Sequence, residues 1–81
     1  MKIIKWLIDW FEKNSDVLRD DIEQNINESY FLRGWIDSLK FINLITDVEE
    51  EFKITFSNDE FQNREFATLN GLTDNIKKKY E

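Results

Sequence analysis

The chain has 81 residues, of which 41% are hydrophobic and 35% charged, and its formal net charge is −6. This length fits one small domain over residues 1–81, and the acidity argues against a nucleic acid partner, because phosphate binding needs a basic face. Cysteine and histidine are both absent, which excludes a thiolate nucleophile, an imidazole base and a zinc–cysteine site, and we expect no metal centre.

The first predicted element is a helix over Met1–Lys13, whose apolar residues form a wide stripe at helical spacing. We expect this stripe to pack in the core. A helix lying on a membrane surface is the alternative, although its polar side carries both signs of charge. Lys5 and Asp9 interrupt the apolar run, so we predict neither a signal peptide nor a membrane span, and we expect a cytoplasmic protein. Ser15 or Asp16 is expected to cap the element that follows it in the chain.

The segment Val17–Trp35 is predicted to be mainly a long connection. Leu18, Ile22 and Ile26 recur every four residues and could form a short helix within it. Gly34 predicts a backbone turn at positive φ. Four bulky residues are expected to cover the helices from one end, as suits a long ordered loop: Tyr30, Phe31, Leu32 and Trp35.

A second long helix is predicted to begin at Asp37–Ser38 and to end near Phe52. Its apolar residues recur at spacings of three and four, which is typical of a buried helix face: Phe41, Leu44, Ile45, Val48 and Phe52. Polar residues are expected on its outer surface: Lys40, Asn43, Asp47, Glu50 and Glu51. After the helix, Ile54 and Phe56 alternate as in a short extended piece that points two side chains inward.

Two further helices complete the chain. A short one is predicted to start at Ser57, and Thr68 is predicted to cap the last one, whose apolar positions are Leu69, Leu72, Ile76 and Tyr80. The triplet Lys77–Lys79 suits the negative end of that helix dipole, the alternative being a nucleic acid patch. The sequence therefore predicts an all-α fold, a small antiparallel bundle of three longer helices and one short third helix, with a long loop between the first and second.

The candidate for chemistry is Ser38, at the point where a glycine-bearing loop turns into an amphipathic helix. A helix N-terminus exposes unpaired backbone N–H groups and a partial positive charge, so a phosphate attached to a serine there is favourably placed. The alternative is that Asp37 or Ser38 serves only as an N-cap.

The flanking residues add a resemblance. Gly34-Trp35-Ile36-Asp37-Ser38-Leu39, followed by the acidic run Glu49–Glu51 and Phe52, resembles the acyl carrier protein family. This implies a bundle of acyl-carrier type and a carrier rather than an enzyme. It also implies a covalent 4′-phosphopantetheine arm on Ser38, which carries acyl or aminoacyl groups as thioesters. The absence of thiol and imidazole side chains agrees with chemistry supplied by an attached group.

The resemblance also implies partners for this chain. A phosphopantetheinyl transferase that uses Mg²⁺ would attach the arm, with Asp37 capping the helix and contacting that enzyme and its metal. A loading ligase and downstream acyl-transfer enzymes would then meet the second helix at Leu39, Asp47, Glu49 and Glu50. The alternative for these carboxylates is a solvated helix face. The chain is expected to act as a monomer.

Four positions depart from the carriers of fatty acid synthesis: Lys40, Asn43 and the bulky pair Trp35-Ile36. The pattern is more similar to D-alanyl carrier proteins and to stand-alone carriers of specialised pathways. Two other classes compete with a carrier. One is a non-catalytic helical interaction domain with an acidic recognition helix. The other is a carboxylate enzyme or calcium site at Glu49–Glu51, whose side chains would point in different directions on a helix.

Overall fold

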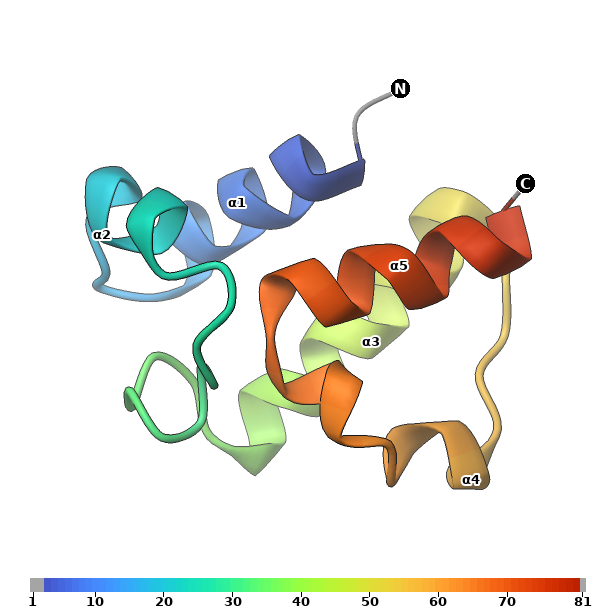
Figure 1. The fold of residues 1–81 in the computed structure, drawn as a ribbon. Coiled ribbons are helices and arrows are strands. Elements are labelled where there is room, and N and C mark those ends of the chain that lie inside the picture. Colours follow the sequence, from blue (N-terminus) through green and yellow to red (C-terminus); the bar gives the residue numbers. More distant parts are fainter. Residues whose placement is uncertain (1–2, 81) are drawn as a thin grey trace.

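The computed structural model describes residues 3–80, and every regular element in that range is helical (Figure 1). The elements are α1 (Ile3–Asn14), α2 (Arg19–Gln24), α3 (Ser38–Phe52), α4 (Asn58–Phe61), the 3-10 turn η1 (Arg64–Ala67) and α5 (Leu69–Tyr80). The predicted all-α bundle of acyl-carrier type is confirmed. Met1 and Lys2, which the predicted first helix included, lie outside the described residues.

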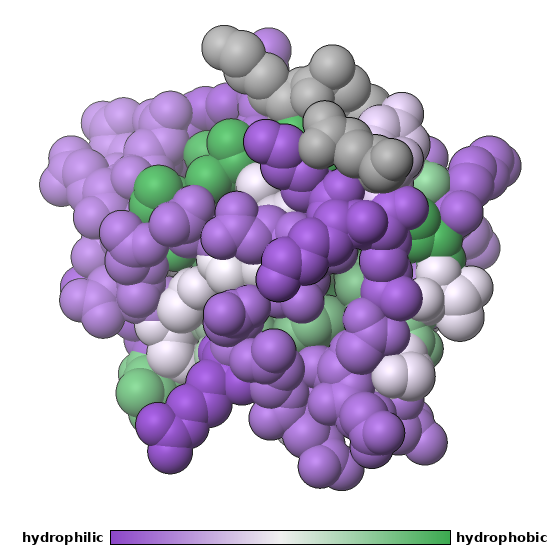
Figure 2. Space-filling model, turned by 45° about the vertical axis from the view of Figure 1, so that its right-hand side comes forward, coloured by the Kyte–Doolittle hydropathy of each residue, from purple (hydrophilic) through white to green (hydrophobic). Residues whose placement is uncertain are grey.

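One apolar core joins the helices. α5 packs against α1 and η1, and α1 also packs against α2. Figure 1 shows α1 and α5 running in opposite directions, so that both ends of the described chain lie on the same side of the molecule. Leu7, Phe11, Leu44, Leu72 and Ile76 are fully buried together in this core. One side of the molecule is covered mainly by hydrophilic side chains, with apolar ones showing between them (Figure 2).

The predicted core face of α3 is confirmed except at its first position. Leu44, Ile45, Val48 and Phe52 are buried, whereas Phe41 is only half-buried. The Phe41 ring lies 5.2 Å from that of Phe31 and 6.3 Å from that of Phe61, centroid to centroid. Phe41 is therefore part of an aromatic edge of the core, because both of these neighbours are themselves partly exposed.

The predicted cap of the second helical segment is wrong. α2 begins after Leu18, whose side chain makes no capping hydrogen bond. The Ser15 hydroxyl instead donates to the Phe11 carbonyl at the end of α1. Ser15 is therefore used to close the preceding helix, and α2 is held by the fully buried Ile22 and by packing against α1.

The four bulky loop residues divide into two groups. Tyr30 is fully buried and Trp35 is half-buried, but Phe31 is 38% exposed and Leu32 is 91% exposed. The prediction that Leu32 covers the helices is wrong. Gly34 adopts the predicted positive φ, 73°, and its N–H donates to the Phe31 carbonyl. This tight turn leaves its tip, including Leu32, in solvent.

The last part of the chain follows the prediction closely. Ser57 and Glu60 form a capping box at the start of α4. The Thr68 hydroxyl accepts a hydrogen bond from the N–H of Gly71 and so caps α5. The turn η1 was not predicted. Leu69, Leu72 and Ile76 are fully buried, whereas Tyr80 is 48% exposed, with its ring 5.4 Å from that of Phe52.

Candidate functional site

Ser38 is the first residue of α3, but it is not the cap of that helix. Asp37 is the N-cap, and its Oδ1 accepts a hydrogen bond of 2.9 Å from the backbone N–H of Lys40. The Asp37 carbonyl accepts from the N–H of Phe41 as the helix begins. Among residues 3–80 the exposed Ser38 hydroxyl has no hydrogen-bond partner, so it is available for chemistry without loss of the cap.

A buried tyrosine fixes the loop that leads to Ser38. The Tyr30 hydroxyl donates to the Phe66 carbonyl, and its backbone N–H donates to the Ala67 carbonyl at 2.9 Å. The backbone N–H of Trp35 donates to the Tyr30 carbonyl, also at 2.9 Å. Burial raises the pKa of the Tyr30 hydroxyl, which therefore stays a neutral donor. Because Ile36 is also buried, both sides of the turn before Asp37 are anchored.

Two exposed apolar side chains lie on α3 close to Ser38. Leu39 is 73% exposed and Ile42, one turn further on, is 60% exposed. Leu39 is therefore accessible next to the serine, and its role as a partner contact stays a prediction.

The three carboxylates predicted for partner binding do not form one free acidic patch. Trp10 Nε1 donates to Asp47 Oδ2 at 2.8 Å, and the backbone N–H of Phe56 donates to Glu49 Oε2 at 2.8 Å. Glu50 is exposed, and no partner for it lies within the described part of the chain. Sequence reasoning missed both bonds, because the Trp10 donor comes from α1 and the Phe56 donor from the connection after α3, and helical periodicity does not show that either lies close.

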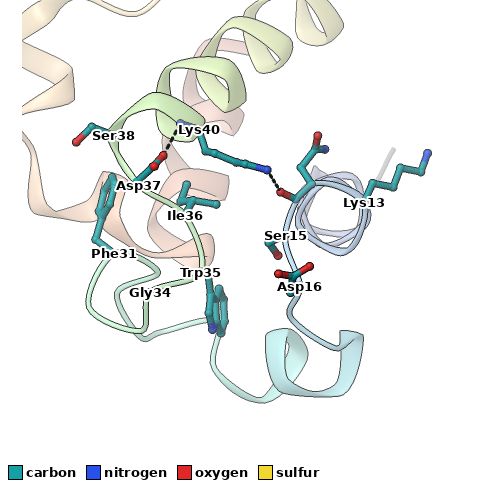
Figure 3. A pocket seen from close by; sticks show the side chains of 11 residues that line it. Lys13, Ser15, Asp16, Phe31, Gly34, Trp35, Ile36, Asp37, Ser38 and Lys40 are labelled. Atoms are coloured by element: carbon teal, nitrogen blue, oxygen red, sulfur yellow. Dashed lines mark hydrogen bonds between the residues drawn. The ribbon is translucent and has the colours of Figure 1, made fainter.

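An open hollow of about 770 Å³ adjoins Ser38 (Figure 3). Its walls are the C-terminal end of α1 with the residues just after it, the turn before α3, and the first turn of α3. The Nζ of Lys40 reaches across to the Asn14 carbonyl, a link that the sequence did not indicate. A group bonded to Ser38 would therefore meet open space rather than a packed wall. The exposed hydroxyl, the intact cap and this space together fit a covalently attached arm.

Comparisons with known proteins agree with this geometry. The family model described as "Phosphopantetheine attachment site" matches residues 12–76. Two D-alanyl carrier proteins of Listeria monocytogenes, from strains CLIP80459 (serotype 4b) and EGD-e (serovar 1/2a), are each 37% identical to the chain over 49 residues. The aligned stretch is 60% of this chain and 63% of each relative. No solved structure matches significantly.

In the range that the structure describes, no helix is both long enough and apolar enough to cross a bilayer.

Proposed function

Because this chain belongs to the family of phosphopantetheine attachment-site domains, we propose that it is a carrier with its arm on Ser38. The observation that supports Ser38 most directly is its free, exposed hydroxyl at the start of a helix that Asp37 caps. The arm supplies a terminal thiol, on which acyl or aminoacyl groups are carried as thioesters. The chain itself has no catalytic role.

The attachment step requires a serine oxygen from this chain but no catalytic group. The Ser38 oxygen forms a bond to the phosphorus that bears the pantetheine part of coenzyme A. The pyrophosphate bond breaks, adenosine 3′,5′-bisphosphate leaves, and the transferase takes up the serine proton with the help of Mg²⁺. The phosphodiester then lies next to the unpaired N–H groups of the first turn of α3, where the helix dipole favours a negative charge. Asp37 keeps the helix capped throughout and contacts the transferase and its metal.

The similarity to D-alanyl carrier proteins supports an aminoacyl cargo. In this proposal an AMP-forming ligase loads the arm with a small amino acid, and a downstream acyl-transfer enzyme removes it. The bulky Trp35 and the cationic Lys40 near the serine agree with a carrier outside fatty acid synthesis. These steps draw on coenzyme A and ATP, so we place the chain in the cytoplasm, as a monomer that forms short-lived complexes.

The partners are proposed to contact α3. Leu39 supplies the apolar contact beside the arm, and Glu50 supplies an exposed charge. Asp47 and Glu49 add charge from positions fixed by their hydrogen bonds to Trp10 and Phe56. Charges at the rim of such a complex mainly raise its association rate, as suits a carrier that must visit several enzymes.

Ser38→Ala, with Ser57→Ala as its matched control, tests the proposal. Ser38→Ala should gain no phosphopantetheine mass with coenzyme A and a transferase, while its stability changes by less than about 0.5 kcal/mol, because Asp37 is the cap. Ser57→Ala breaks a capping box and should lose about 1 kcal/mol yet gain the mass.

Mass spectrometry and urea unfolding measure the two effects separately. A mass gain on Ser38→Ala would show that another residue is modified. No gain on the wild-type chain with a transferase that is active on a reference carrier would favour a helical interaction domain without a prosthetic group.

A further inference from the structure

The hollow beside Ser38 combines two features that the carrier role alone leaves unexplained. Trp35 and Ile36, which are bulkier than the residues in carriers of fatty acid synthesis, form part of its floor, and Lys40 crosses its far side (Figure 3). These are three of the four departures noted in the sequence, and the fold places all three in one hollow. Their convergence suggests a common ligand.

The hollow suits a ligand of mixed polarity. Lys40 holds its ammonium group at the Asn14 carbonyl, and because an ammonium has three donors, two remain for other acceptors. The half-buried indole of Trp35 offers apolar surface next to it. Negative charge is also present in the lining, on Asp16 and Asp37. A chain of alternating amide and hydrocarbon groups matches such a surface better than a bare acyl chain does.

A second groove is smaller and more apolar than the hollow beside Ser38. It lies between α3 and α4, encloses about 370 Å³ and is lined by Phe41, Ile42, Ile45, Thr46, Glu49 and Phe61. This lining is mainly apolar, and Glu49 is the only ionisable residue of the six. It therefore offers fewer hydrogen-bonding partners to the amides of an arm than the hollow does.

Because the arm would be tethered at Ser38, weak contacts are sufficient to hold it in the hollow. Ser38 and Lys40 both line the hollow, but their side chains leave opposite faces of the first turn of α3, so an arm fixed to the serine has to turn back past that turn to reach the ammonium (Figure 3). A tethered ligand has an effective concentration in the millimolar range, so no high intrinsic affinity is needed.

We propose that the phosphopantetheine arm rests across this hollow, with its amide groups at Lys40 and its methyl groups against Trp35. This inference rests on the proposed attachment at Ser38. In the resting state the arm lies on the α1 side of Ser38. Release to a partner enzyme then requires only that these weak contacts break.

Amide and indole N–H resonances of the ¹⁵N-labelled chain, before and after modification with coenzyme A and a transferase, test the proposal. The Trp35 indole resonance and the backbone amides of Asn14–Asp16 are expected to shift on modification. The indole resonances of Trp6 and Trp10 are expected to stay in place, because neither residue lines the hollow. Trp35→Phe assigns the third indole signal.

Two lysine variants sharpen the test. Lys40→Gln removes the ammonium and should reduce the modification-induced shift at Trp35, because a weaker neutral donor lowers the fraction of molecules in which the arm lies in the hollow. Lys53→Gln makes the same change at the other end of α3 and should leave the shift at its wild-type size.

The outcomes separate this proposal from the attachment itself. If the mass increases but the shifts stop at Asp37–Leu39, the arm is in solvent and the resting place is wrong. If they appear instead at Ile45 and Phe61, the arm lies in the second groove. If the mass of the wild-type chain does not increase, attachment at Ser38 fails and this proposal with it.

Discussion

Trp10 Nε1 donates a hydrogen bond of 2.8 Å to Asp47 Oδ2, and this bond joins α1 to α3 across 37 positions of the sequence. Trp10 is only 6% exposed, whereas Asp47 lies on the surface. The carboxylate thus satisfies an indole N–H that would otherwise be buried without an acceptor. Asp47 therefore has a structural role in addition to the partner contact proposed for it.

We expect Asp47→Ala to destabilise the fold by about 1–3 kcal/mol, because it leaves the Trp10 N–H unsatisfied. Asp47→Asn keeps an acceptor oxygen and should lose less. Glu50→Ala, on the same helix and without a partner in the described residues, is the control and should be nearly neutral. Urea unfolding measures all three. Equal stability of Asp47→Ala and Glu50→Ala would show that the hydrogen bond contributes nothing.

Gly71→Ala should be destabilising although Gly71 lies inside α5. In an open helix alanine is more favourable than glycine by about 1 kcal/mol. Here a Cβ would lie within 2.9 Å of the Glu65 Cα and closer still to its carbonyl oxygen, because η1 packs directly on α5. We expect a net loss of about 1–3 kcal/mol. Asp74→Ala, at an exposed position of α5, should be neutral or slightly stabilising in the same thermal unfolding series.

Glu60 should make part of the stability depend on pH. The backbone N–H of Ser57, and after it Lys79, lower the pKa of the Glu60 carboxyl below its ordinary value. A lowered pKa in the folded state stabilises the fold above the unfolded-state pKa, about 4.3 for glutamate, and this contribution is lost as pH falls through the folded-state pKa.

Glu60→Gln isolates this contribution, because glutamine preserves the capping box but does not ionise. The free energy of unfolding should fall less steeply below about pH 4.3 in the variant than in the wild type. Urea unfolding at a series of pH values between 3 and 7 measures the difference. Parallel curves for the two proteins would contradict the role given to Glu60.

Glu50→Lys should slow loading by the transferase at low salt, by about twofold to tenfold, with unchanged helix content. The difference should shrink as salt rises, because screening weakens the interaction of exposed charges. Asp74→Lys changes the net charge equally, but on α5. Loading rates across a salt series test this. If the two variants slow loading equally, only net charge matters and the α3 face is not a specific contact. Glu49 is not a suitable site for charge reversal, because its carboxylate also binds the N–H of Phe56.

The sequence alone determined the helical architecture and the candidate serine, because both are encoded locally. Apolar spacing set the buried face of α3, and the short-range capping patterns at Asp37, Ser57 and Thr68 marked where helices begin. The positive φ at Gly34 was likewise predictable, since few other residues adopt it.

Only the tertiary structure decided which polar groups are free. Asp47, Glu49 and Lys40 look alike in the sequence, as charged residues of a solvated helix. Yet each is bonded to a group outside α3, namely to Trp10, Phe56 and Asn14 respectively. The same holds for Leu32, which is apolar but exposed, and for Gly71, whose small size is required by the carbonyl of Glu65. Such pairings depend on where separate segments meet in the folded chain, and helical periodicity describes only the neighbours along one helix.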